Sequence, residues 1–223
     1  MRFHEVRIYL PRIALALLVA GTLSAPSLPA HAEPAAAKHL VVAERADDLI
    51  ARFRATLKPG AAQAGVFSRT IFDVLLAQPG ASQLRVYHAM YAGGRPTFVL
   101  YAADASGEDF DDAPGNRAIP SGGDELPDGS GFASALAASD HLVTREHAED
   151  IIERFASTAA ATAVLSHAFE RGLIDALLAQ PKAAGLRINY GTRANGSEAL
   201  VLYAVEANGH ELAGLVGISD VIR

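Results

Sequence analysis

The segment LLAQPGASQLRV at residues 75–86 returns as LLAQPKAAGLRI at residues 177–188. The second segment begins 102 residues after the first, since 177 − 75 = 102. The same offset relates residues 39–110 to residues 141–212, where 30 of the 72 aligned pairs are identical without a gap. Solenoid repeats have periods of ~20–50 residues, so this longer repeat indicates a duplicated small domain.

Each copy reads as two helices followed by a hairpin. In the first copy, apolar residues at helical spacing predict helices over 43–57 and 62–78, each followed by Pro-Gly. Alternating and β-forming residues then predict strands over 84–88 and 97–102. The change of period from helical to alternating places the hairpin after the second helix.

The second copy repeats this order. Thr144 can cap a first helix, and a second helix is predicted over 161–180. Strands are predicted over 186–192 and 199–205, joined at an Asn-Gly turn. Residues 212–222 form either a last strand or a tail that covers the core.

The predicted fold class is therefore α+β, with two tandem helix–helix–β-hairpin units and an antiparallel sheet that carries the helices on one face. The predicted boundaries are a signal peptide at 1–32, a first unit at 38–112, an acidic linker rich in Gly and Pro at 113–140, and a second unit at 141–223.

The N-terminus has the three parts of a secretory signal. Arg2, Arg7 and Arg12 precede an apolar run over 13–25, and a small-x-small motif ends at Ala32. A membrane span needs ~20 apolar residues, more than this run offers. The sequence thus predicts cleavage after Ala32 and a periplasmic or secreted product without an integral membrane span.

The composition narrows the function classes. The formal net charge is −6 and no basic stripe is present, so no nucleic-acid partner is predicted. The chain contains no cysteine, which excludes disulfides, thiolate metal sites and a cysteine nucleophile. The predicted partner is an unknown protein or small molecule.

The chain lacks the motifs of zincins, nucleophile elbows and phosphate loops. His88 falls on a predicted core face, where a hydrogen-bonded structural histidine is expected. His167 falls in a predicted helix, and its counterpart in the first copy is Gly65, which argues against a shared role. The acids near 104–109 do not have the spacing of a calcium loop. We therefore predict no catalytic residue, no metal site and no cofactor.

Five residues form the candidate ligand or partner surface. If the second hairpin has a two-residue turn, the Arg of the Leu-Arg motif points away from the face that seats the helices. The other face is then half apolar and carries Arg187 and Asn189, and in the first copy Arg85, Tyr87 and Phe98.

A half-apolar second face suggests two alternatives. The copies can pack against each other, in one continuous sheet or face to face, because a lone hairpin is only marginally stable. The rival is that these faces form a surface for a partner or ligand. We favour mutual packing.

The segments LRINYG at 186–191 and LVLYAVEANG at 200–209, which follow the LLAQP motif, resemble a group of small uncharacterised exported bacterial proteins. In that group a helix ends before Gln-Pro-Gly, and a strand leads to a Val-Asp-Ala-Asn-Gly turn. The resemblance covers about 70 residues of one copy at a time and implies no catalytic residue.

These observations favour an exported, non-enzymatic binding or interaction protein. The alternative is a periplasmic enzyme, for example a hydrolase, with its site between the two units. Acidic residues and histidines from both copies that converge in a compact pocket would favour the enzyme.

Overall fold

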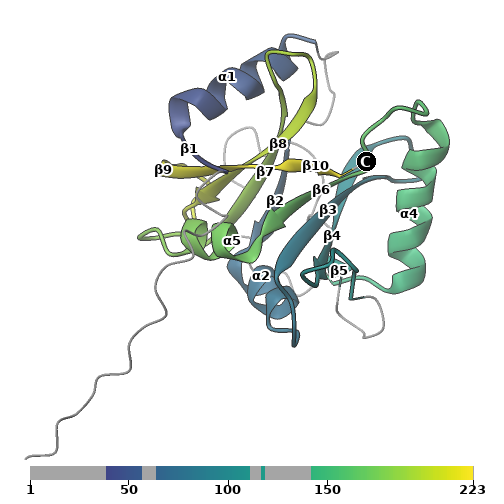
Figure 1. Cartoon of the computed structure of the whole chain (residues 1–223), viewed down its shortest axis with the longest axis horizontal. Coiled ribbons are helices and arrows are strands. Elements are labelled where there is room, and N and C mark those ends of the chain that lie inside the picture. The colour runs from purple at the N-terminus through teal and green to yellow at the C-terminus, as the bar shows by residue number, and fades with distance from the viewer. Residues whose placement is uncertain (1–38, 57–63, 111–116, 119–141, 223) are drawn as a thin grey trace, which may run out of the picture. The chain divides into compact units, whose positions relative to one another are not determined.

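The computed structural model describes residues 39–56, 64–110, 117–118 and 142–222. Within these ranges the chain forms four α-helices and ten strands, which build two five-stranded sheets (Figure 1). All of the sheet pairings are antiparallel. The predicted α+β class is therefore confirmed. The predicted signal peptide, and the predicted linker apart from 117–118, lie outside the described residues.

The first copy begins with a short strand and an amphipathic helix. Ala46, Leu49 and Ile50 are the buried residues of this helix, and they recur at the spacing of one helical face. The elements up to the linker are β1 (Leu40–Val42), α1 (Ala43–Arg54), β2 (Ala64–Ser68), α2 (Arg69–Leu76), β3 (Gln83–Met90), β4 (Pro96–Ala103) and β5 (Arg117–Ala118).

The second copy starts with a capped helix, as predicted. The Thr144 side chain accepts a hydrogen bond from the His147 amide at 3.3 Å. The segment 212–222, left open between strand and tail, contributes two strands. The elements are α4 (Arg145–Thr158), β6 (Ser166–Glu170), α5 (Arg171–Leu178), β7 (Gly185–Thr192), β8 (Glu198–Val205), β9 (Glu211–Ile218) and β10 (Asp220–Ile222).

The two copies exchange strands. One sheet has the order β1-β9-β8-β7-β2 and the other β10-β6-β3-β4-β5. Strand β2 of the first copy thus pairs with β7 of the second, where Phe67 faces Leu186. Reciprocally, β6 pairs with β3, and Phe169 faces Leu84 at the same register. We call the sheet that contains β8 sheet A and the sheet that contains β3 sheet B.

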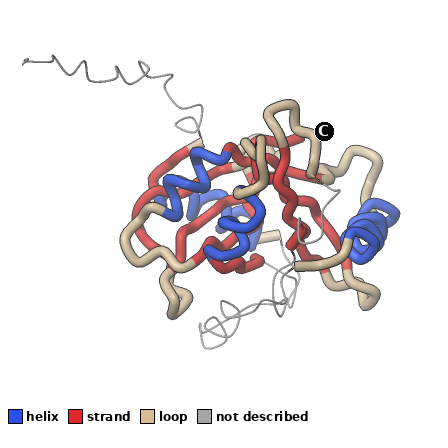
Figure 2. The backbone as a smooth tube through the Cα atoms, turned by 90° about the horizontal axis from the view of Figure 1, so that it is seen from below, coloured by secondary structure: helices blue, strands red, loops and turns tan. Residues whose placement is uncertain are grey.

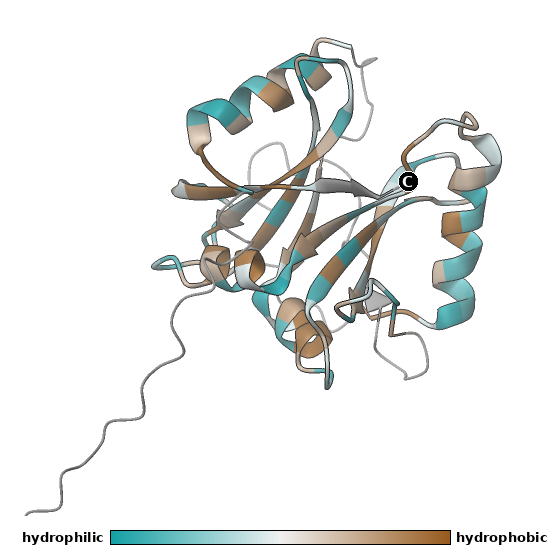
Figure 3. Cartoon of the chain, viewed as in Figure 1, coloured by the Kyte–Doolittle hydropathy of each residue, from teal (hydrophilic) through white to brown (hydrophobic). Residues whose placement is uncertain are grey.

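The first helix of each copy also crosses to the other copy. Helix α1 packs on β7, β8 and β9 of sheet A. The approach is close, because a Cβ at Gly191 would lie 3.0 Å from Leu49 Cβ. Helix α4 packs on β3 and β4 of sheet B, with Ala148 and Ile151 buried against Val99. Figure 2 shows α4 on one side of the strands, and in Figure 3 its hydrophilic residues face away from them. The outer face of each hairpin is therefore covered by the other copy.

The inner faces of both sheets enclose one shared core. Helices α2 and α5 contribute their apolar sides to this core, and each contacts the other. The buried residues include equivalent pairs from the two copies, such as Leu84 with Leu186 and Leu100 with Leu202. The expectation that the copies pack against each other is confirmed, because both faces of each hairpin contact the other copy.

Two parts of the predicted architecture were wrong. Residues 64–68 of the predicted 62–78 helix form strand β2, and residues 166–170 of the predicted 161–180 helix form β6. The helices also cover both faces of the sheets instead of one: α1 lies on the outer face of sheet A, whereas α5 packs on its inner face against Gly217.

The turn of the second hairpin is one residue longer than expected. The last strand pair is Thr192 with Glu198, and the Arg193 amide bonds to the Ser197 carbonyl at 2.8 Å. Gly196 takes a φ of 80°, as a three-residue loop of this kind requires. This extra residue reverses which residues of β8 share a face with those of β7.

Candidate metal centre

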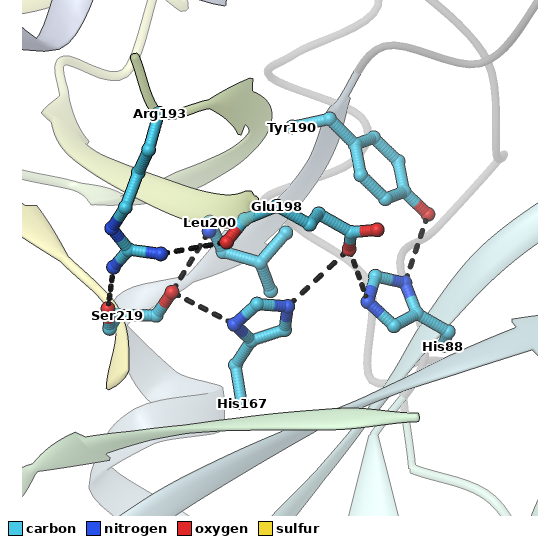
Figure 4. Close-up of polar contacts among 7 residues, drawn as sticks. All are labelled: His88, His167, Tyr190, Arg193, Glu198, Leu200 and Ser219. Atoms are coloured by element: carbon cyan, nitrogen blue, oxygen red, sulfur yellow. Dashed lines mark hydrogen bonds and ion pairs between the residues drawn. The ribbon is translucent and has the colours of Figure 1, made fainter. Parts of the chain in front are cut away.

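Three side chains of metal-ligand type meet in the shared core: His88 on β3, His167 on β6 and Glu198 at the start of β8 (Figure 4). His167 pairs with Val86, a core residue two positions before His88, so both imidazoles lie on the inner face of sheet B. Glu198 reaches them from sheet A. His88 belongs to the first copy and the other two residues to the second, so the exchange of strands builds the site.

One carboxylate oxygen lies between the two rings. Glu198 Oε1 is 2.7 Å from His88 Nε2 and 3.3 Å from His167 Nε2. The three ligand atoms all lie within 4.8 Å of one another. The histidine side chains are 2% and 0% exposed, whereas that of Glu198 is 35% exposed. The carboxylate is therefore the solvent-facing side of the cluster.

The second ring nitrogen of each histidine has a hydroxyl partner. His167 Nδ1 is 2.8 Å from Ser219 Oγ, which also accepts the Leu200 N–H at 2.8 Å. His88 Nδ1 is 3.4 Å from the Tyr190 hydroxyl. These contacts hold both rings with Nε2 directed at the carboxylate, which is the way that supporting hydrogen bonds orient metal-binding histidines.

Arg193 fixes the backbone around the site. Its guanidinium donates to the Glu198 carbonyl and to the Ser219 carbonyl, each at 2.6 Å. These two bonds connect the start of β8 to the end of β9. The strand ends that carry the carboxylate and the supporting hydroxyl are thereby held in one position.

The surroundings shift the pKa values of His167, Glu198 and Tyr190 in different directions. Burial is the main cause that lowers the pKa of His167 below its ordinary value, and it favours the neutral ring. Burial opposes ionisation of Glu198, but the hydrogen bond from His167 and the close approach of His88 outweigh it and lower its pKa to about 2. Burial also raises the pKa of Tyr190, which keeps its hydroxyl protonated.

An aromatic stack encloses the centre. Tyr190 lies 5.5 Å from His88 at an interplanar angle of 16°, Phe53 stacks on Tyr190 at 5.1 Å, and Phe155 stacks on His88 at 5.2 Å. These are two repeat-related pairs, since His88 and Tyr190, like Phe53 and Phe155, stand 102 residues apart. The repeat symmetry thus places an aromatic position of each copy at the junction of the sheets.

The polar residues around this stack do not follow the repeat. The first copy has Gly65 where the second has His167, and Pro96 where the second has Glu198. The side of the junction around His88 thus carries metal-ligand side chains, whereas the repeat-related side around Tyr190 carries Gly65 and Pro96. A shared structural role in both copies therefore does not explain them.

Two imidazoles and one carboxylate match a divalent transition metal. Ligand atoms bound to a tetrahedral zinc ion at ~2.0–2.1 Å lie about 3.3 Å from one another, and the carboxylate oxygen is 2.7 and 3.3 Å from the two nitrogens. Without a metal, the His167 Nε2–H can donate to Glu198, whereas His88 Nε2 approaches the same oxygen at 2.7 Å without forming a hydrogen bond. The arrangement can thus hold an ion or a proton network.

The structure places the predicted surface residues of the first copy on two different faces. Arg85 and Tyr87 lie together on the outer face of sheet B: the guanidinium is 4.8 Å from the Tyr87 ring centre and 3.5 Å from Asp109, and the Tyr87 hydroxyl bonds to Asp109. Phe98 pairs with His88 instead, is 1% exposed, and belongs to the shared core. Its assignment to the surface of Arg85 was wrong.

The two predicted residues of the second copy lie on sheet A. Arg187 pairs with Glu211 at 3.1 Å, which corresponds to the Arg85 pair of the first copy. Asn189 is 1% exposed and pairs with Val201 on the outer face that α1 covers. Four of the five predicted residues therefore lie on outer faces, two on each sheet. Phe98 does not, because the first hairpin has the same longer turn and pairs Phe98 with His88.

Sequence reasoning missed His167 and Glu198 as site residues. The expectation that His88 is a buried, hydrogen-bonded core residue is confirmed. His167 lies on a strand and not on the predicted helix. A usable signal was present, because His167 and Glu198 are polar in the second copy where the first copy has Gly65 and Pro96.

Comparison with protein-family models, curated proteins and solved structures found no match to the chain. In the described part of the chain, every helix is too short or too polar to span a membrane. The function must therefore be inferred from the site.

Proposed function

We propose that the protein is an exported binding protein whose ligand is a divalent transition metal ion, held by His88, His167 and Glu198. The observation that carries this proposal is the convergence of three ligand atoms within 4.8 Å, with each imidazole oriented by a second partner. The proposed partner is a small inorganic ion. The proposed location outside the cytoplasm rests on the signal-like N-terminus.

Zinc fits this ligand set best. Two imidazole nitrogens and one carboxylate oxygen form a common three-residue zinc set, and carbonyl-rich calcium sites differ from it. The Glu198 side chain is 35% exposed, so solvent reaches this side of the cluster, where a zinc ion would take its fourth ligand from water. The ring nitrogens opposite the ion would donate their protons to the Ser219 and Tyr190 oxygens.

Calorimetric titration of the chelator-treated full chain with zinc chloride tests the proposal. We expect one ion per chain, with at least tenfold weaker binding in His167→Asn and Glu198→Gln. His147→Ala is the matched control, because His147 is exposed at the start of α4 and should leave binding unchanged. Circular dichroism melts identify any variant that has lost its fold.

Two results would overturn the metal proposal. One is the absence of zinc binding by the folded wild-type chain. The other is binding of equal strength by wild type and by a folded Glu198→Gln variant, since that change keeps the size of the side chain and removes the charge.

A second candidate function is a periplasmic enzyme of the hydrolase class, with its site between the copies. The specific observation in its favour is that His88 comes from the first copy and Glu198 from the second. A three-ligand zinc site with a bound water can supply a hydroxide nucleophile near neutral pH. Zinc-dependent hydrolysis of p-nitrophenyl acetate that Glu198→Gln abolishes would support the enzyme, and equal rates in both proteins would exclude it.

A further inference from the structure

A pocket of about 440 Å³ lies next to the candidate metal centre. Its lining comes from β1 and the residue before it, one side of α1 from its first to its last turn, the turn between β7 and β8, and the end of β9. Arg193 belongs both to this lining and to the backbone contacts of the centre. The volume is in the range of ~300–1,000 Å³ that small-molecule sites occupy.

One face of α1 supplies two cationic groups to the pocket. Arg45, Leu49 and Arg52 recur at i, i+4 and i+7, so they lie on the same side of the helix, and all three line the pocket. Together with Arg193 they bring three guanidinium groups to one small cavity. Val41, Leu49 and Ile218 add an apolar wall.

The two guanidinium groups that α1 supplies to the pocket have no bonding partner within the described part of the chain. Neither Arg45 nor Arg52 forms an ion pair or a side-chain hydrogen bond with any described residue. The second copy behaves differently, because Arg154, the equivalent of Arg52, contacts both carboxylate oxygens of Asp150 at 2.8 and 2.6 Å. The Asp–Arg ion pair is thus formed on α4, whereas the equivalent Asp48 and Arg52 on α1 do not form it.

The charge of the pocket is opposite to that of the protein. The chain has a formal net charge of −6. The lining holds three arginines against one carboxylate, that of Asp48, and His39 completes its titratable groups. A guanidinium presents paired N–H donors that match the two oxygens of a carboxylate or phosphate.

We propose that this pocket binds a small organic oxyanion. Its carboxylate or phosphate head contacts Arg45 and Arg52 in the field of Arg193, and its apolar body lies against Val41, Leu49 and Ile218. The site is separate from the metal centre: none of the three metal-ligand residues lines the pocket. Anion binding is therefore expected in the metal-free protein.

The test uses the full chain in chelator, with phenylacetate and phenyl phosphate as the two anionic probes and benzyl alcohol as the neutral probe. Ligand-observed NMR should detect at least one anion and not the alcohol. In Arg45→Ala/Arg52→Ala the dissociation constant of that anion should rise at least tenfold. Which head group binds more tightly then separates the two oxyanion classes.

Two control variants make the result specific. Arg154→Ala removes the equivalent arginine of the second copy and should leave binding unchanged. His147→Ala should also retain it, because His147 is exposed at the start of α4 and does not line the pocket. The proposal is overturned if neither anion binds the folded wild-type chain, or if the double variant binds the anions as well as wild type does.

Discussion

At the scale of single residues, the tautomer of His167 differs between the metal-free hydrogen-bond network and the metal-bound centre. In a metal-free network the Leu200 N–H donates to Ser219 Oγ, the Ser219 hydroxyl donates to Nδ1, and the Nε2–H donates to Glu198. Metal binding needs the lone pair of Nε2, so the ring proton must move to Nδ1. Ser219 permits either state, because a hydroxyl can donate to Nδ1 or accept from it.

The lowered pKa of His167 predicts a loss of stability in acid for the metal-free protein. Below pH 6.5 the unfolded chain binds a proton at this histidine, whereas the folded chain does not until the pH reaches its lower pKa. The free energy of unfolding should therefore fall by up to about 1.4 kcal/mol per pH unit in this window. Urea denaturation in chelator between pH 7.5 and 5 measures the slope.

His167→Asn separates this cause from general acid sensitivity. The variant should lose most of the slope between pH 6.5 and 5, whereas His147→Ala should keep it. Glu198 acts in a lower window: its folded pKa of about 2 lies below the ordinary 4.5, so its contribution is present above pH 4.5 and is lost as the pH falls through 2. An unchanged slope in His167→Asn would contradict the assignment.

At this scale the sequence predicted that His88 is buried, but it did not predict which residues surround it. The position of His88 in an alternating strand was enough to place it in the core. Its neighbours come from β6 and β8, which are 79 and 110 positions further along the chain. Only the exchange of strands brings them together, and no local spacing in the sequence encodes that exchange.

At the scale of elements, two equivalent arginines bind the copies to each other. Arg69 at the start of α2 donates to the carbonyls of Leu178 and Ala183, at the end of α5 and in the loop after it. Arg171 at the start of α5 donates reciprocally to the Leu76 carbonyl at 2.6 Å. A cation is favourable at a helix C-terminus, where carbonyls lack partners within the helix.

Arg69→Ala should therefore destabilise the fold more than loss of a surface ion pair does. The partly buried guanidinium makes charge-assisted bonds to carbonyls that have few alternatives, so we expect a loss of about 1–3 kcal/mol. Arg154→Ala, which removes the exposed pair with Asp150, should cost about 0.5 kcal/mol or less. Chemical denaturation at pH 7.5 measures both variants, and equal losses would show that Arg69 is only a surface residue.

The missed strands have a physical reason at this scale. In 64–68 the apolar residue Phe67 also fits the helical stripe that Ile71, Val74 and Leu75 continue, so a single helix over 62–78 accounted for it. The conversion to strand depends on pairing with β7 of the other copy, a long-range contact. By contrast, α1 and α4 were predicted well, because their apolar periodicity is complete within each helix.

At the scale of the whole molecule, the two copies form an intertwined pair within one chain. The first copy gives β1, α1 and β2 to sheet A, and the second copy gives α4, β6 and β10 to sheet B. Exchange of identical elements between subunits is a known route to a dimer. In this chain the two duplicated copies, joined by the linker, exchange elements in the same way within one polypeptide. A single copy alone would lack the two strands and the helix that the other copy adds to its sheet.

This arrangement predicts that the connection between the copies is not needed once the protein has folded. A protease recognition site inserted between residues 125 and 135 of the full chain allows the linker to be cut after folding. We expect the two fragments to stay associated in a 1:1 complex, because they share the inner core and both exchanged sheets. Native mass spectrometry and size-exclusion chromatography measure the association.

Urea provides the control, since the cut protein should separate into its fragments only under conditions that unfold the sheets. Its unfolding should also depend on protein concentration, unlike that of the uncut chain, because dissociation then accompanies unfolding. Fragments that separate in native buffer, each with a folded circular dichroism spectrum, would show that each copy is an independent domain. The candidate metal centre sharpens this test: it draws ligands from both copies, so bound zinc should raise the urea concentration at which the fragments part, and Glu198→Gln should remove that effect.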